Sequence, residues 1–423
     1  MKFSLPPGTF PALELANEDM EDMENVAAML VDSAIADYEH HRLENNGFAD
    51  RKRWKPIKQL AGVTMYEDRS VKQGGKRESV NPAATPPSSG IHALMAFGTT
   101  RGDLNELMFG LLNPTREEML AKSACTGDYL TDCAELASII SPTPSNPLRS
   151  LQVKWSLIGR GPPLVSVVIR PRDFVYLDST GITLDSQGEH VGYNLRHSVE
   201  VAGVRELEEH QIVRANISFC RLFRQKRDGI IEVFMAGCVD AMGYRYPIHS
   251  SIIMTQIADA LLSCQRLLLN ARMKKLAWML STNKQALVAP STGRHTKNKC
   301  SSCGCSIGRQ ILHSRRTCRL CAGPVCPHCR VPLKIAWTSR EDGGEFGEKN
   351  LMQGTTRREK ALVCRPCLRK VDLTSAVEVA VDEIRRASPL LAAESGMAVA
   401  SASSLFSLIN SDRFDRDFFF VSQ

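Results

Sequence analysis

Residues 250–280 read SSIIMTQIADALLSCQRLLLNARMKKLAWML, and this stretch decides the fold of the larger part of the chain. Its apolar side chains recur at helical spacing and its charged side chains occupy other positions, which is the pattern of an amphipathic helix. At about 1.5 Å per residue, such a helix would extend roughly 45 Å. The stretch therefore predicts one long helix, from about residue 250 to 280, that could lie across a whole sheet.

The residues before this helix carry strand patterns. Residues 151–157 alternate between apolar and polar side chains, and residues 212–223 and 230–239 flank an Asp228-Gly229 turn, as in a β-hairpin. Two short helices are expected at residues 104–112 and from Thr115, where Thr115 and Glu118 form a capping-box pattern. Strands followed by one long helix predict an α+β domain with a curved antiparallel sheet.

A curved sheet that grips a long amphipathic helix encloses an elongated space between them. Side chains can fill that space, or it can hold an apolar ligand, and the residues alone leave both open. Residues 164–169 add a nearly continuous apolar run that indicates a further strand, whereas residues 67–90 contain almost nothing to bury and predict a flexible excursion.

The first 50 residues are expected to hold an amphipathic helix over about residues 18–44. Asn17 can cap it, and Met23, Ala27 and Tyr38 belong to its apolar stripe. Packing against the neighbouring domain and binding to a partner both remain open for this stripe.

Cysteines mark the C-terminal part of the chain, because nine of the 14 lie between residues 300 and 367. They form four CxxC pairs: Cys300 and Cys303, Cys318 and Cys321, Cys326 and Cys329, Cys364 and Cys367. Two residues between cysteines let both sulfurs reach one Zn²⁺, so eight thiolates fit two closed, structural zinc sites. Cys305 is surplus to this count. A dense cluster in a chain without an apparent export signal favours metal over disulfides.

Positive charge gathers in the same segment. Residues 291–370 hold 17 Lys and Arg against 5 Asp and Glu, a formal +12, so that the rest of the +7 chain carries −5. This segment should meet an anionic partner, or its charge should offset the thiolates. It lacks interleaved aromatic residues for base stacking, so no nucleic acid is expected.

The chain from about residue 50 to 282 resembles the START family of lipid-binding domains. The resemblance rests on Trp54–Tyr66, on Ile169–Val175 and on the closing helix. It implies a helix-grip fold over residues 51–285 with an internal pocket for one hydrophobic lipid.

Residues 286–372 resemble the FYVE-type zinc finger, through the basic run Ser314–Ala322. This family holds two zinc ions in a cross-brace and docks on endosomal membranes through phosphatidylinositol 3-phosphate. The resemblance implies that Cys300, Cys303, Cys326 and Cys329 share one ion and that Cys318, Cys321, Cys364 and Cys367 share the other. Arg315, Arg316 and Arg319 would contact the headgroup, and Ile311 and Leu312 would enter the membrane.

The finger departs from its family at three places. The two histidines expected before the third cysteine fall on Arg316 and Thr317, no Trp-x-x-Asp precedes Cys300, and Leu362 stands in place of an arginine. The zinc scaffold is therefore matched more fully than the headgroup pocket.

The order of the two modules is similar to that of START/FYVE proteins abundant in oomycetes. It implies a cytoplasmic, non-enzymatic adaptor, peripheral at endosomal membranes, that binds a lipid and docks on a membrane or a protein. The alternatives are a RING-like ubiquitin ligase and a purely structural finger for protein interaction. No catalytic constellation is expected, and residues 373–423 should form a short helix and a largely disordered tail.

Overall fold

The computed structural model describes residues 9–10, 13–43, 48–70, 91–159, 170–242, 247–287, 299–307, 317–337 and 357–387. Most of the excursion predicted at residues 67–90, the apolar run 164–169 and the tail from residue 388 lie outside these residues.

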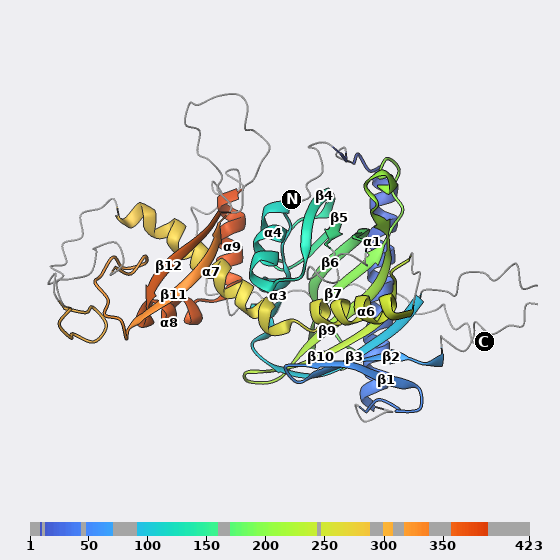
Figure 1. The fold of residues 1–423 in the computed structure, drawn as a ribbon, viewed down its shortest axis with the longest axis horizontal. Helices are drawn as coiled ribbons and strands as arrows, with labels where there is room; N and C mark the ends of the chain where they lie inside the picture. The colour runs from blue at the N-terminus through green and yellow to red at the C-terminus, as the bar shows by residue number, and fades with distance from the viewer. Residues whose placement is uncertain are drawn as a thin grey trace, which may run out of the picture.

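A long antiparallel sheet forms the centre of the larger domain (Figure 1). Its order is β1-β2-β3-β10-β9-β7-β6-β5-β4, and the short β8 pairs with β6 in parallel. The strands are β1 (Trp54–Leu60), β2 (Val63–Asp68), β3 (Ile91–Arg101), β4 (Leu130–Ile140), β5 (Ser150–Ile158), β6 (Arg172–Leu184), β7 (His190–Ser198), β8 (Val213–Arg214), β9 (Asn216–Arg227) and β10 (Ile230–Asp240). The predicted hairpin at Asp228-Gly229 is confirmed as β9 and β10, and Gly229 has the left-handed φ of 70° that such a turn favours.

Helices cover both faces of this sheet (Figure 1). One face, here called the grip face, packs against α3 (Leu104–Leu111), α6 (Pro247–Leu261) and α7 (Cys264–Leu287), with α4 (Arg116–Thr126) beside them. The opposite face, here called the α1 face, packs against α1 (Asn17–Leu43). The architecture is α+β and of helix-grip type, as the sequence predicts, and the capping box of Thr115 and Glu118 starts α4.

The predicted single helix over residues 250–280 is wrong in one respect, because the structure divides it. Helices α6 and α7 meet at an angle of 46°. The Ser263 hydroxyl donates to the carbonyl of Ala260, and the Leu267 N–H bonds to Ser263, so that Ser263 starts a new helix. Among the described residues no single helix is long and apolar enough to span a bilayer, although α6 and α7 together meet the length and composition criteria.

The predicted N-terminal helix packs on the sheet rather than facing solvent with its apolar stripe. Ala27, Val31 and Tyr38 are buried in the core of the α1 face. Tyr38 also donates a hydrogen bond of 2.5 Å to Glu232, which joins α1 to β10. The packing interpretation of this stripe is therefore confirmed.

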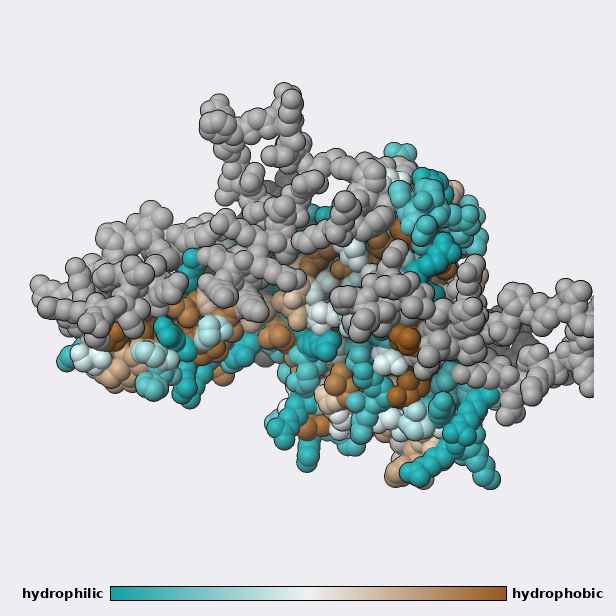
Figure 2. Space-filling model, in the orientation of Figure 1, coloured by the Kyte–Doolittle hydropathy of each residue, from teal (hydrophilic) through white to brown (hydrophobic). Residues whose placement is uncertain are grey.

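The C-terminal module is built from β11 (Arg330–Trp337), β12 (Arg357–Cys364) and α8 (Arg365–Leu373), and α9 (Ala376–Ala387) follows it. It shares a core with the end of α7, where Met273, Leu276 and Met279 pack against the cysteine-bearing loops. Helix α9 then returns to the main domain and buries Val379 among the residues that α3 and the sheet contribute. On the face drawn in Figure 2, hydrophobic and hydrophilic residues are interspersed over both parts.

Candidate metal centres and ligand cavity

The first candidate metal centre joins Cys318, Cys321, Cys364 and Cys367. Their four sulfurs lie within 4.8 Å of one another, and the Cys321 and Cys364 sulfurs are 3.9 Å apart. Cys364 ends β12 and Cys367 lies in the first turn of α8, so the strand-to-helix junction presents both thiols to the loop that carries the other pair. This is the grouping that the zinc-finger resemblance implies.

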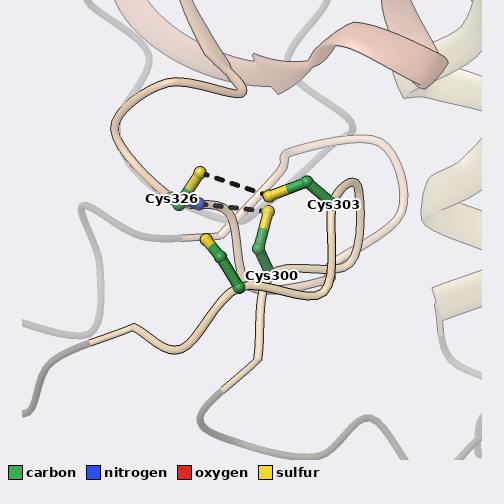
Figure 3. Close-up of side chains that lie close together, drawn as sticks. Cys300, Cys303 and Cys326 are labelled. Carbon is green, nitrogen blue, oxygen red and sulfur yellow. Dashed lines mark hydrogen bonds between the residues drawn. The ribbon is translucent and has the colours of Figure 1, made fainter.

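The second candidate centre differs from the predicted set. Cys300, Cys303, Cys305 and Cys326 have sulfurs within 4.8 Å of one another, with the Cys303 and Cys326 sulfurs 3.7 Å apart (Figure 3). Cys305, which the sequence leaves surplus, thus joins this group, and Cys329 is outside it. The cause is a tight turn in which Gly304 has a φ of 74° and the Cys300 N–H bonds to the Cys305 carbonyl at 2.8 Å.

Cys329 nevertheless lies beside the second centre. Hydrogen bonding with the Cys303 thiol, burial and hydrogen bonding with the Cys326 thiol raise the pKa of Cys329 to about 12. Five cysteines therefore gather around a centre that needs four ligands.

Backbone amides support the thiolate form in both centres. The N–H of Cys326 donates to the Cys300 sulfur at 3.4 Å, and the N–H of Cys364 donates to the Cys318 sulfur at 3.3 Å. Burial acts against ionisation of Cys300, but backbone N–H groups outweigh it and lower its pKa to about 6. Hydrogen bonding from Cys321, with backbone donors, lowers the pKa of Cys318 to about 4.

These donor sets fit a tetrahedral metal ion. Sulfurs at about 2.3 Å from a tetrahedral Zn²⁺ lie about 3.8 Å from one another, and the two sulfur pairs above are 3.7 and 3.9 Å apart. Sets of four thiolates suit Zn²⁺ and leave no open position for a reacting water. The geometry therefore indicates structural metal centres.

Of the predicted membrane contacts, Arg319 alone belongs to the described residues. Its side chain is exposed, and its N–H bonds to the Leu362 carbonyl, which ties the loop to β12. Arg315, Arg316, Ile311 and Leu312 lie outside the described residues.

The grip face holds a partly open cavity of about 70 Å³ next to α4. Leu111, Met119, Leu130 and Ile158 give it an apolar part. Its polar part is made by Asn113, Lys122, Asp128, Tyr176, Asp178 and Arg196. Ligand pockets usually measure about 300–1,000 Å³, so in this conformation side chains fill most of the space between the sheet and its helices.

A buried ionic network surrounds the polar part of the cavity. Lys154 donates to Asp178 at 2.7 Å, and Asn194 donates to the same carboxylate at 3.1 Å. Burial would raise the pKa of Asp178, but Lys154 and Arg196 hold it well below its usual range. Burial also raises the pKa of Tyr176 to about 12, so that this phenol stays protonated.

The residue pattern of β5 does not reveal this network. Gln152, Lys154 and Ser156 of β5 are 2%, 3% and 6% exposed, although the alternation of β5 is usually a sign of one solvated face. The helices that cover the polar face are distant in sequence, so the alternation alone could not reveal them.

The sequence holds two adjacent histidine–serine pairs, His197 with Ser198 and His249 with Ser250, and the described residues show no catalytic arrangement around the first. His197 hydrogen-bonds through Nδ1 to the hydroxyl of Ser218 at 2.9 Å, rather than to the adjacent Ser198. The side chains of His249 and Ser250 lie outside the described residues.

No family model and no curated protein matches this chain. Among solved structures, human StAR-related lipid transfer protein 5 aligns with 15% identity over 58% of this chain and 97% of its own, at a TM-score of 0.37. Human STARD10 aligns with 14% identity over 59% of this chain and 83% of its own, at 0.35. A STAR-related lipid transfer protein fragment from Xanthomonas axonopodis aligns with 14% identity over 52% and 99%, at 0.29.

Proposed function

We propose that the chain is a non-enzymatic adaptor in which the helix-grip domain binds one lipid and the zinc-bound module docks on a membrane or a protein. The observation that carries the proposal is the shared use of α7. Leu267 and Ala271 of this helix belong to the grip core, and Leu276 and Leu280 belong to the core of the cysteine module. Docking at the cysteine module would therefore act on α7, the helix that also covers the ligand cavity.

Entry of a lipid requires the cavity to enlarge, and α4 is the element that can allow it. Only Met119 and Thr126 of this helix are buried, whereas six of the eight residues of α3 are buried. Elements with few buried apolar contacts open at the lowest free energy. Displacement of α4 would enlarge the cavity and its opening to solvent and leave the sheet and α7 in place.

Lipid binding is tested by extracting the purified full chain with organic solvent and identifying released lipids by mass spectrometry. The proposal expects one lipid per chain. A chain that releases no lipid at native expression and takes none up from vesicles would contradict it.

Zinc in the two centres would supply folding free energy to a module too small to fold on apolar burial alone. Its role is structural, because four thiolates close each site. The residues that would hold it are Cys318, Cys321, Cys364 and Cys367 in one centre and four of the five cysteines in the other.

Docking through an anionic membrane, as at endosomes, is supported by the +12 charge of residues 291–370. Vesicles with and without phosphatidylinositol 3-phosphate distinguish headgroup recognition from general charge attraction. The double variant Arg315→Ala with Arg316→Ala should lose vesicle binding. Arg51→Ala with Lys52→Ala, which removes two exposed charges before β1, is the matched control. Equal binding by both variants and to both vesicle types would leave the module as a protein-docking or structural finger.

A further inference from the structure

The second metal centre has one thiol more than a tetrahedral ion can use. Cys300, Cys303, Cys305 and Cys326 have sulfurs within 4.8 Å of one another. Cys329 hydrogen-bonds with the thiols of Cys303, Cys326 and Cys300. A tetrahedral ion takes four of these five sulfurs as ligands, so one of them is always left over.

The five thiols make two alternative ligand sets. The turn set consists of Cys300, Cys303, Cys305 and Cys326. The paired set, which the CxxC spacing predicts, contains Cys329 in place of Cys305. Because three cysteines are common to both sets, the fourth ligand can change while three bonds to the ion remain. A thiol that is already held beside the ion enters without a diffusional encounter.

The buried part of the centre is common to both sets. Cys300 and Cys326 are each 3% exposed, and the N–H of Cys326 donates to the Cys300 sulfur at 3.4 Å. Cys305 is exposed and Cys329 is half-buried. The fourth ligand can therefore change near the surface while the buried pair stays in place.

The exchange of the fourth ligand is balanced in atoms and in charge. As the sulfur of Cys329 bonds to the ion, the bond between Cys305 and the ion breaks, and the proton of the incoming thiol passes to the departing thiolate. The number of thiolate ligands and the net charge of the centre stay the same. The step requires no oxidant, reductant or other reactant.

The two sets connect different parts of the module. In the turn set, three ligands lie on the turn between the paired residues Lys299 and Ser306, and Cys326 is the one ligand from the loop before β11. In the paired set, Cys329 adds a second ligand from that loop. The N–H of Arg365, the first residue of α8, donates to the Cys329 carbonyl at 3.2 Å. The paired set therefore ties the turn more firmly to α8.

We propose that the ion of the second centre alternates between the turn set and the paired set, so that Cys305 and Cys329 are ligand and free thiol in turn. This inference rests on the proposed zinc binding and assigns an adjustable link to one of the two centres. Covalent modification of whichever thiol is free would fix the centre in the set that lacks this thiol. The first centre has four cysteines and no such alternative.

The test is limited alkylation of the zinc-loaded full chain with N-ethylmaleimide. The reagent adds a free thiol across its double bond, so that an S–C bond forms and the thiol proton goes to the neighbouring carbon, whereas a zinc-bound thiolate is already engaged as a ligand. Native mass spectrometry selects chains that keep two zinc ions, and fragmentation locates the label. These chains should carry the label on Cys305 in one fraction and on Cys329 in the other, and never on both.

Two variants fix the ligand set. Cys305→Ser leaves the paired set and Cys329→Ser leaves the turn set, so each should keep two zinc ions and lose the label at the remaining member of this pair. Cys238→Ser, which removes a half-buried thiol of β10, is the matched control and should be labelled at Cys305 and Cys329 as in wild type.

The outcomes separate the exchange from zinc binding itself. A label on one member of the pair only, or on neither, in wild-type chains with two zinc ions would overturn the alternation and leave zinc binding intact. Loss of an ion from either single variant would overturn it as well, because that cysteine would then be an indispensable ligand. Fewer than two zinc ions in the wild-type chain before alkylation would contradict the metal centres.

Discussion

The two metal centres differ in the number of cysteines that are available as ligands. The centre of Cys318, Cys321, Cys364 and Cys367 has four sulfurs and no reserve. The other centre has Cys305 inside the close group and Cys329 beside it. A centre with five nearby thiols should tolerate the loss of Cys305 or of Cys329, because four thiolates still remain to complete a tetrahedral site.

Cys305→Ser and Cys329→Ser should each therefore retain two zinc ions per chain, whereas Cys321→Ser should retain one. Inductively coupled plasma mass spectrometry of the purified variants measures this directly. The double variant Cys305→Ser with Cys329→Ser should lose the second ion. Loss of an ion in the Cys305 variant alone, with full occupancy in the Cys329 variant, would assign the fourth ligand to Cys305. It would also show that Cys329 does not replace Cys305.

Asp178 makes the stability of the folded domain depend on pH. Its pKa in the folded chain lies below the value of about 3.9 in an unfolded chain. The carboxylate therefore contributes stability that is fully present above pH of about 4 and is lost as the pH falls further.

Asp178→Asn should lower the free energy of unfolding at pH 7 by about 3 kcal/mol, because it leaves the buried Lys154 ammonium without its ion-pair partner. The variant should also lose stability less steeply than wild type below pH of about 4. Urea unfolding at several pH values provides the measurement. The exposed Asp228→Asn is the control, and a variant that follows the wild-type pH curve would contradict this assignment.

At the scale of elements, α7 transmits order from the metal module to the main domain. Its Lys275 is 2% exposed, bonds to Glu106 of α3 at 2.7 Å and donates to the Thr374 carbonyl after α8 at 3.0 Å. Helix α9 adds the hydrogen bond from Trp278 to Asp382. The end of α7, α8 and α9 should therefore depend on the module for their position.

Removal of metal by a chelator should increase hydrogen exchange in α8, in α9 and in the second half of α7. Helix α1, which packs on the opposite face, should keep its protection. Exchange measured by mass spectrometry distinguishes the two groups of peptides. Uniform loss of protection, α1 included, would show that the whole chain unfolds without metal. Unchanged exchange in α9 would show that the position of this helix does not depend on the metal module.

Elements were predictable from the sequence where the pattern is local. The hairpin at Asp228-Gly229, the capping box of Thr115 and the apolar stripe of α1 each depend on neighbours in the chain. The division of the long helix at Ser263 depends on one hydroxyl that bonds to a backbone carbonyl, which the apolar stripe alone does not reveal.

The sites followed the same rule. Cysteine spacing was enough to predict seven of the eight grouped sulfurs. Cys305 takes the place predicted for Cys329 because Gly304 turns the chain back on itself, which is a matter of backbone conformation. The polar network was not predictable, since Lys154, Asp178 and Arg196 lie on three strands, β5, β6 and β7, and become neighbours only through the register in which these strands pair.

For the whole molecule, we expect one chain to carry two metal ions and one lipid. The two hydrophobic cores meet along α7, so the metal ions and the lipid should be bound to the same folded chain. Native mass spectrometry of the full chain weighs that particle directly. We expect a mass increased by two zinc ions and by one lipid, with the lipid lost on solvent extraction and the zinc lost on acidification. A folded chain whose mass equals that of the polypeptide alone would contradict it.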